Sequence, residues 1–315
     1  MLKLGLVLFL CGAVANAAYE GPGSKENLHQ TLMVRCQQFR ALVFEKRLMS
    51  EHDRDGLAHC EAIVVAFLGA FKDKGPCDVT PSSYDKVIKM TMKSLGSDKV
   101  TLWSGVNYPI QYLKEFAKAI GLYALETGTF LGYMGDGLVF CGQKGGEGIN
   151  YENCPRWGEC ENGGDAVGNF WKSISKAFAS TAEGKVKILM MGSGKEGWHA
   201  YRPGSVLGSV ELPMIFTTSR VKSLEPLLVH EPGKPITDNC GTGSMEEMEH
   251  LIKQHGIGYT CTNNPPALQA VICKHYPGVP SCQESKEWNN SVEEEGRNGY
   301  AIHESNSNGE GFRYY

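Results

Sequence analysis

The sequence predicts an α/β protein of two lobes, a mainly helical N-terminal lobe followed by a lobe with a small parallel β-sheet flanked by helices. Three observations carry this prediction. Apolar residues in the first half recur at spacings of three and four, which is typical of amphipathic helices. In the second half, short apolar runs alternate with helical stretches, as in folds with parallel strands. An even number of cysteines in the mature chain favours a fold stapled by five disulfides.

The composition of the 315-residue chain excludes several classes of protein. Hydrophobic residues make up 42% and charged residues 21%, so the chain can bury a core and is not disordered throughout. The net charge of −4 provides no basic field that would recruit nucleic acid or an anionic membrane surface. No sustained repeat of glycine, heptads or longer units is present, which excludes collagen-like, coiled-coil and solenoid proteins.

The N-terminus has the pattern of a secretory signal peptide over residues 1–17. Lys3 precedes an apolar run at 4–14, and the tripeptide ending at Ala17 fits the small-x-small rule for cleavage. This run is too short to span a bilayer. We expect a mature chain, beginning at residue 18, that is secreted or held in the lumen of secretory granules, without a membrane anchor.

The cysteines indicate disulfides rather than a metal site. Cys11 lies in the leader, which leaves ten of the eleven cysteines. An even number in an oxidising compartment favours five disulfides. No Cys-x-x-Cys pair and no His-Glu-x-x-His spacing occurs, so we expect no metal.

The first lobe is predicted over about residues 18–168. Apolar residues at helical spacing predict four helices in it, at 28–39, 57–71, 84–92 and 112–124. The clearest of them, the second, is followed by a Lys-Gly-Pro stop. Glycine and proline become dense between residues 128 and 168, where three cysteines also lie, so we expect a stapled connection there.

The second lobe is predicted over about residues 169–284. Its expected elements are a helix at 170–182, a buried strand at 186–191, a strand at 226–230, a helix at 245–255 and a strand at 257–261. From residue 285 the chain is polar and acidic. We expect a disordered tail over 285–315 with an exposed glycosylation acceptor at Asn289.

A G-x-G-x-x-G pattern over residues 192–197 directly follows the first expected strand. In a dinucleotide-binding fold such glycines open a long helix against a pyrophosphate. Here Pro203 and Gly204 interrupt any such helix, and Glu196 stands where a P-loop needs Ser or Thr. No G-x-S-x-G elbow occurs either. We therefore expect no Rossmann site, no P-loop and no ordinary serine hydrolase.

Three short stretches carry chemically informative residues instead. Trp103 is followed by small residues, Trp171 opens a helix, and Glu211 lies in a β-like apolar run at 208–213. A carboxylate in such a run would point from a strand end into a cleft. The structural alternative is that both tryptophans are core residues and that Glu211 is a solvated surface acid. The residues alone favour this alternative.

Together with three further motifs, these stretches resemble the ADP-ribosyl cyclase family. The further motifs are Leu125-Glu126, Leu131-Gly132-Tyr133 and Ile149-Asn150-Tyr151-x2-Cys154-Pro155-x-Trp157. The resemblance runs from about Arg35 to Cys282. It implies a two-lobed enzyme of the secretory pathway that cleaves NAD, releases nicotinamide and forms cyclic ADP-ribose, ADP-ribose or both. NAD is then the substrate, so no cofactor is expected.

The resemblance also implies how the ten cysteines pair, because each has a counterpart in the family's five-disulfide invertebrate form. The implied pairs are Cys36–Cys60, Cys77–Cys160, Cys141–Cys154, Cys240–Cys261 and Cys273–Cys282. Some family members carry one more pair, whose cysteines would fall near Ser97 and Glu183. Both are missing here, so no thiol is left without a partner.

The family's site residues fall on particular positions of this sequence. Glu211 corresponds to the catalytic carboxylate, which can stabilise or trap the oxocarbenium ion that forms as nicotinamide leaves. Glu126 corresponds to a second acid that influences cyclisation against hydrolysis. Trp171 belongs to the catalytic set as well, because indoles can stack on the nicotinamide ring and hold the intermediate folded. The implied substrate contacts are Trp103, Ser104, Leu125, Trp171, Ser175, Ser205 and Leu207.

Two departures from the family pattern concern these contacts. The stretch between Glu126 and Tyr133 is one residue longer than usual, and the Asp that often follows the acid is missing. Val206 and Leu207 stand where the family has Phe or Thr and then Phe. The resemblance implies that these positions lie near the substrate and influence the choice of product.

Two other functions compete with the NAD-cleaving enzyme. One is a catalytically silent, disulfide-rich scaffold that binds a receptor or glycan, although it would have no physical reason to keep Glu211 with both tryptophans. The other is a glycan hydrolase that uses Glu126 and Glu211 as acid and base. The partners implied by the resemblance are a nucleotide, NAD or else NADP, and a second copy of the chain in a homodimer. No nucleic acid is expected.

Overall fold

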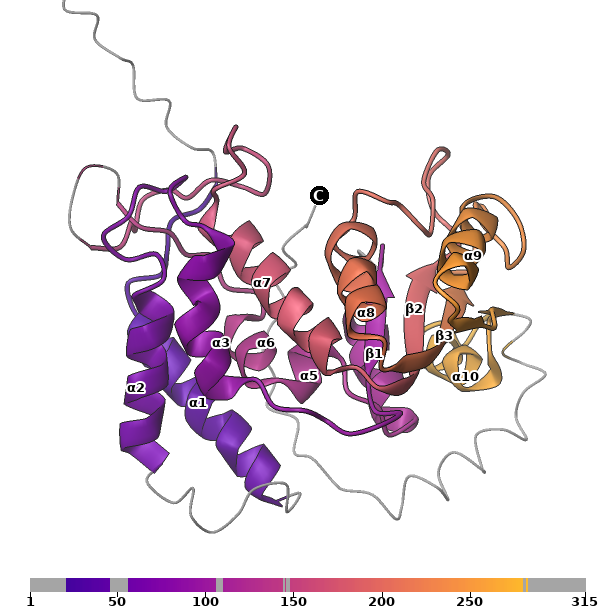
Figure 1. Cartoon of the computed structure of the whole chain (residues 1–315), viewed down its shortest axis with the longest axis horizontal. Helices are drawn as coiled ribbons and strands as arrows, with labels where there is room; N and C mark the ends of the chain where they lie inside the picture. The colour runs from indigo at the N-terminus through magenta and orange to yellow at the C-terminus, as the bar shows by residue number, and fades with distance from the viewer. Residues whose placement is uncertain are drawn as a thin grey trace, which may run out of the picture.

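The computed structural model describes residues 21–45, 56–105, 110–143, 145, 148–279 and 282. The predicted leader at 1–17, the predicted tail at 285–315 and Asn289 lie outside these residues. The described residues form an α/β fold, with helices gathered on one side and a sheet flanked by helices on the other (Figure 1). The predicted fold class is therefore confirmed.

A parallel sheet of five strands forms the second region. Its strands are β1 (Thr101–Ser104), β2 (Gly184–Met191), β3 (Val221–Val229), β4 (Gly258–Tyr259) and β5 (Thr262–Asn263). They lie in the order β1-β2-β3-β4, β5 also pairs with β3, and every pair is parallel. The carboxyl ends of the strands therefore meet at one edge, where open parallel sheets bind their ligands.

Strand β1 comes from the half of the chain for which we predicted helices. It pairs with β2, Trp103 opposite Leu189, so the sheet draws on both halves of the sequence. Four residues are too few for a period-2 pattern to stand out. The predicted strand at 257–261 is shorter than expected, because only β4 lies within it and β5 begins just after it. Thr260 and Cys261 separate the two strands, and Cys261 is disulfide-bonded to Cys240 outside the sheet.

Helices of the first region pack around aromatic side chains. They are α1 (Leu28–Glu45), α2 (Gly56–Leu68), α3 (Asp85–Thr91) and α6 (Phe130–Gly135). The ring centroid of Phe67 lies 5.0 Å from that of Phe140 and 5.3 Å from that of Phe170. The buried hydroxyl of Tyr84 donates to the carbonyl of Ala166 at 2.8 Å. The hydroxyl of Tyr84, whose ring packs against Phe67 and Phe170, therefore has its hydrogen-bond partner.

The helix predicted at 112–124 is shorter than expected. Helix α4 (Ile110–Ala119) ends before Gly121, whose φ of +67° suits a residue without a Cβ. The one-turn helix α5 (Leu125–Gly128) follows. Thr129 separates it from α6, because its side chain caps α6 by accepting from the N–H of Gly132 at 3.1 Å. The stretch that is one residue longer than the family pattern contains this junction.

Helix α7 (Ala166–Thr181) runs through the middle of the molecule, between the helical region and the sheet region (Figure 1). It begins four residues before the predicted start because Asp165 caps it, with the carboxylate accepting from the N–H of Gly168 at 2.5 Å. The boundary predicted between residues 168 and 169 falls inside this helix. One continuous core extends through α7 and joins both regions.

The remaining helices flank the sheet. They are α8 (Leu212–Thr218), α9 (Ser244–Gln254) and α10 (Pro266–His275). Helix α9 lies within one residue of its predicted bounds, whereas α10 was not predicted. Within the described part of the chain, no helix combines the length and the apolar composition that crossing a membrane requires.

Five disulfides hold the described residues together, with the pairing that the family resemblance implies. They join Cys36–Cys60, Cys77–Cys160, Cys141–Cys154, Cys240–Cys261 and Cys273–Cys282. The region of the missing sixth pair is held by hydrogen bonds instead. The N–H of Asp98 donates to the carbonyl of Glu183 at 3.0 Å, and the carboxylate of Asp98 accepts from the N–H of Lys185 at 2.6 Å.

Candidate active site

Glu211 lies on a helix, and the prediction of a β-like run at 208–213 is wrong. The residue ends a π-helical turn, η3 (Leu207–Glu211), that continues directly into α8. Pro213 stands in the first turn of α8, where its missing N–H costs no hydrogen bond. The turn starts at Ser205, whose hydroxyl accepts from the N–H of Gly208 at 3.2 Å. Turns of this kind are frequent at functional sites.

Glu211 is also buried, with 6% of its surface exposed, so the alternative of a solvated surface acid is wrong. Its carboxylate is hydrogen-bonded to Ser175 of α7. Trp171 lies one helical turn before Ser175 and therefore on the same face of α7. The indole of Trp171 is half-buried, and its ring packs edge-on against Phe170 at 5.2 Å.

Glu126 is the second buried carboxylate, with 3% of its surface exposed. It lies on α5, and its Oε1 accepts a hydrogen bond from the indole Nε1 of Trp103 at 2.9 Å. Trp103 belongs to β1, so this bond joins the carboxyl end of a sheet strand to the helical region. The predicted tryptophan and the predicted second acid are therefore direct partners.

Burial raises the pKa values of both carboxyls. The pKa of Glu211 rises to about 8, because desolvation outweighs the hydrogen bond from Ser175 and the charge of Glu126 adds repulsion. The pKa of Glu126 rises to about 7, again mainly by desolvation. Asp136 raises that pKa further, whereas the hydrogen bond from Trp103 and the charge of Lys114 lower it. A site with two such acids favours a ligand that carries positive charge.

Several buried polar atoms of this region have no hydrogen-bond partner. In the part of the chain that the structure describes, six buried side-chain atoms share this property. Four of them belong to predicted site residues, namely Ser104 Oγ, Glu126 Oε2, Trp171 Nε1 and Glu211 Oε2. Leaving such a group unpaired costs about 1–3 kcal/mol. Their concentration here indicates a place where a polar ligand completes the hydrogen bonding.

The other predicted contacts differ in how free their side chains are. Leu125 and Leu207 are buried apolar residues on α5 and η3. Ser205 uses its hydroxyl within the turn, donating to the carbonyl of Arg202 at 2.7 Å and accepting from Gly208. It therefore starts η3, and its predicted role as a substrate contact stays a prediction.

Sequence reasoning missed two side chains near these residues. Trp198 and Arg202 lie in the loop after β2, the loop that contains the G-x-G-x-x-G pattern. As expected, no helix follows that pattern before Ser205. The sequence feature that could have pointed to them is an aromatic residue followed, four residues later, by a cation, in a segment with neither helical nor strand periodicity. Among the described residues, no group of three or more His, Cys, Asp or Glu side chains could hold a metal ion.

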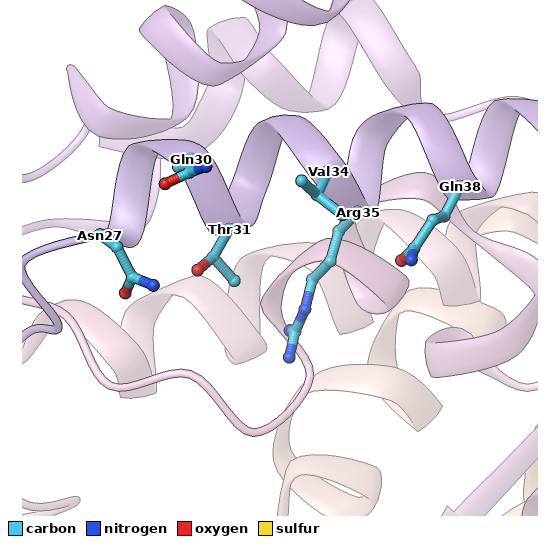
Figure 2. Close-up of a pocket in the computed structure, with 6 residues that line it drawn as sticks. All are labelled: Asn27, Gln30, Thr31, Val34, Arg35 and Gln38. Carbon is cyan, nitrogen blue, oxygen red and sulfur yellow. The ribbon is translucent and has the colours of Figure 1, made fainter. Parts of the chain in front are cut away.

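A separate groove of about 380 Å³ runs along α1 and is lined by none of these residues (Figure 2). Its lining residues are Asn27, Gln30, Thr31, Val34, Arg35 and Gln38. The guanidinium of Arg35 donates to the carbonyls of Met134 and Asp136 at 2.9 and 2.6 Å. Arg35 thus ties α1 to the end of α6, and we assign the groove no role in the chemistry.

Comparison with known proteins points to one family. The family model described as ADP-ribosyl cyclase matches residues 25–282. An ADP-ribosyl cyclase/cyclic ADP-ribose hydrolase from Aplysia kurodai is 31% identical over 264 residues, covering 83% of this chain and 88% of the relative. The human ADP-ribosyl cyclase/cyclic ADP-ribose hydrolase 2 is 30% identical over 268 residues, covering 85% and 79%.

Solved structures agree with the sequence comparison. The Aplysia cyclase, in a complex with substrate NGD and product cGDPR, superposes with a TM-score of 0.70 at 30% identity, covering 83% of this chain and 98% of that one. Porcine CD38, in a complex with a covalent intermediate, ribo-F-ribose-5'-phosphate, superposes with a TM-score of 0.67 at 32% identity, covering 78% and 99%.

Proposed function

The chain belongs to the ADP-ribosyl cyclase family, and we propose from this premise that it cleaves the nicotinamide–ribose bond of NAD, releasing nicotinamide and forming cyclic ADP-ribose, ADP-ribose or both. One observation carries the proposal for this chain. Two buried carboxylates, Glu211 and Glu126, each have one hydrogen-bond partner and one unpartnered oxygen. They lie beside the carboxyl end of β1 with the two predicted tryptophans.

The chemistry needs a stabilised cation. When the bond between the ribose anomeric carbon and the nicotinamide nitrogen breaks, the bonding electrons go to the nitrogen and positive charge develops on the ribose. The ionised carboxylate of Glu211 stabilises this charge or takes it up by forming a C–O bond. An adenine ring nitrogen then displaces the carboxylate to give the cyclic product. Attack by water, with loss of a proton, gives ADP-ribose instead.

The raised pKa values fit a substrate that is itself a cation at the reacting end. At neutral pH the empty site holds much of Glu211 in its neutral form, since its pKa is about 8. The nicotinamide ring of NAD is positively charged, so its arrival favours the ionised carboxylates and lowers both pKa values. The charge that Glu211 needs is thus formed when substrate binds.

The neighbouring residues orient the reactants. Trp103 holds Glu126 through the 2.9 Å hydrogen bond, and Ser175 holds Glu211. Trp171 lies beside Ser175 and offers an aromatic face, on which a cationic ring is worth about 0.5–2 kcal/mol. NAD is the substrate in this proposal, with NADP as a second candidate, and no metal or organic cofactor takes part.

We propose in addition that the chain works in a secretory compartment or outside the cell. Five disulfides require an oxidising environment to form and persist. The signal peptide and the glycosylated Asn289 belong to this proposal, although both lie outside the described residues. The homodimer rests on the family resemblance alone.

The competing functions explain less. A catalytically silent scaffold gains nothing from two buried acids, which destabilise the fold when they ionise. A glycan hydrolase would use the same pair as acid and base, but nothing in its substrate calls for two acids that attract a cation.

The experiment is direct. Residues 18–315 are expressed through an oxidising secretory route, incubated with NAD, and the products are separated by chromatography. We expect nicotinamide with cyclic ADP-ribose, ADP-ribose or both. Disulfide-bonded protein that releases no nicotinamide overturns the proposal and favours the scaffold, and cleavage of glycans without cleavage of NAD favours the glycan hydrolase.

A further inference from the structure

The loop after β2 presents a cation that the proposed chemistry does not use. The guanidinium carbon of Arg202 lies 4.2 Å from the centroid of the Trp198 ring. Stacking of this kind holds the planar guanidinium in one orientation and leaves its edge for a planar or tetrahedral anion. Trp198 is half-buried, so the pair is partly shielded from solvent.

The indole of Trp198 lies against the ends of two neighbouring strands. A Cβ at Gly105, directly after β1, would come within 3.3 Å of the indole, and one at Gly194, after β2, would also come within 3.3 Å. Glycine at both positions lets the ring lie close to the backbone. The residue before Gly105 is Ser104, so the Arg202–Trp198 stack lies next to the predicted site at the carboxyl edge of the sheet.

The segment that carries Arg202 is firmly held. The N–H of Ala200 donates to Asp238 Oδ2 at 2.8 Å, and the N–H of Tyr201 donates to Ser244 Oγ at 3.1 Å. The N–H of Ser205 donates to the carbonyl of Arg202 at 3.0 Å. The guanidinium is thus presented from a backbone fixed on both sides, as a ligand-binding residue requires.

Arg202 nevertheless lacks an anionic partner. It forms no ion pair with any residue that the structure describes, and its Nε is buried without an acceptor. Burial lowers its pKa, and no carboxylate offsets that effect. The hydroxyl of Ser104, 4% exposed, is also unpartnered. The Nε of Arg202 and the hydroxyl of Ser104, the residue before Gly105, are thus two buried hydrogen-bond donors without acceptors, a cost that an anion would remove.

We propose that Arg202, held on Trp198, binds the pyrophosphate of the dinucleotide together with the hydroxyl of Ser104. This inference rests on the proposed function and adds a substrate-binding residue to it. The two acids attract the cationic nicotinamide end of the substrate, and Arg202 attracts its anionic centre. The negative charges of the site would then face the positive nicotinamide ring of NAD, and the positive charge of Arg202 would face its pyrophosphate.

Calorimetric binding of inorganic pyrophosphate tests the proposal without requiring turnover. The variants are Arg202→Gln, Arg202→Lys and the matched control Lys195→Gln, which removes an exposed cation from the same loop. We expect Arg202→Gln to weaken pyrophosphate binding at least about tenfold, Arg202→Lys to weaken it less, and Lys195→Gln to leave it near the wild-type value. Equal losses in Arg202→Gln and Lys195→Gln, or no pyrophosphate binding by the wild type, overturn the proposal.

Kinetics separate this proposal from the proposed function. Arg202→Gln is expected to raise KM for NAD about tenfold or more with little change in kcat, and to leave cleavage of nicotinamide riboside, which has no phosphate, unchanged. A loss of kcat on both substrates would show a structural role instead. Wild-type protein that binds pyrophosphate but does not cleave NAD would refute the proposed function and leave the anion site standing.

Discussion

The aromatic core around Phe67 and the candidate site around Glu211 both bury their central side chains, but they differ in how their polar atoms are partnered. In the core, rings meet at 4.8–5.8 Å, and the hydroxyl of Tyr84 has its acceptor. In the site, two carboxylates each keep an unpartnered oxygen.

Helix α7 belongs to both regions. Phe170 faces the aromatic core, and its neighbour Trp171, with Ser175 one turn later, faces the site. The comparison indicates that the core stabilises the fold while the site gives up stability for a ligand. Substitutions in the core should therefore lower the free energy of unfolding and spare NAD turnover, whereas substitutions in the site should lower NAD turnover and spare folding.

The largest expected effect is on catalysis. Glu211→Gln keeps the size and the burial of the side chain but removes the charge that stabilises the ribosyl cation. We expect NAD turnover to fall by at least about 10³-fold, with folding and disulfides intact. Nicotinamide release by chromatography measures the loss, and the near-ultraviolet circular dichroism of the variant serves as the control for folding. Near-normal turnover by the folded variant would remove Glu211 from the catalytic role.

The second effect is on stability alone. Phe67→Ala leaves a cavity at the centre of the aromatic core and is expected to lower the free energy of unfolding by about 3–5 kcal/mol. The kcat of the fraction that remains folded should be unchanged, because Phe67 packs against other rings of the core, namely Phe71, Phe140 and Phe170. Val65→Ala on the same helix is the control, since Val65 is 54% exposed, and should cost less than about 0.5 kcal/mol. Urea unfolding and active-site titration report the two quantities, and similar losses in both variants would contradict the comparison.

The two buried acids make stability and activity depend on pH in opposite directions. Both carboxyls have an ordinary pKa of 4.5, which the fold raises to about 7 in Glu126 and about 8 in Glu211. Between pH 4.5 and about 8 the folded protein binds more protons than the unfolded chain. The free energy of unfolding therefore falls by several kcal/mol as pH rises from 5 to 8 and levels off above that range.

Activity should rise over the same range, because kcat/KM follows the ionised carboxylate of the free enzyme. Denaturation profiles and initial rates at each pH measure both trends, and Glu211→Gln should flatten much of the fall in stability. The assignment of raised pKa values would be contradicted if the free energy of unfolding of the wild type increased from pH 5 to 8, and did so by more than that of Glu211→Gln.

The contrast between the regions also explains which helices and strands could be predicted from the sequence. Helix α2 and strand β2 were predicted because long apolar patterns identify elements that bury one face. The helix that carries Glu211 was not predicted, since it depends on the cap at Ser205 and on packing against α7, which no local pattern of residues shows. The division between α4 and α5 likewise depends on one glycine with positive φ.

The site residues were placed by resemblance, and their contacts came from the fold. Trp103 and Glu126 are 23 residues apart, and nothing in either segment predicts their hydrogen bond. Arg202 was overlooked because its meaning depends on Trp198 lying against Gly105, almost a hundred residues earlier in the chain. Long-range packing of this kind leaves no periodic signal in the sequence.

The smallest expected effect concerns the choice of product, and it separates two neighbours of the site. Trp171→Ala removes the indole that holds the intermediate folded, so the cyclic fraction of the product should fall about threefold or more, in keeping with a stacking energy near 1 kcal/mol. Ser104→Ala removes a hydroxyl that we assign to the pyrophosphate, which should weaken NAD binding and leave the product ratio nearly unchanged. Chromatography at equal NAD consumption measures the ratio for both variants. An unchanged ratio in Trp171→Ala would mean that the indole does not hold the folded intermediate, because Trp171 would then act on both product branches equally.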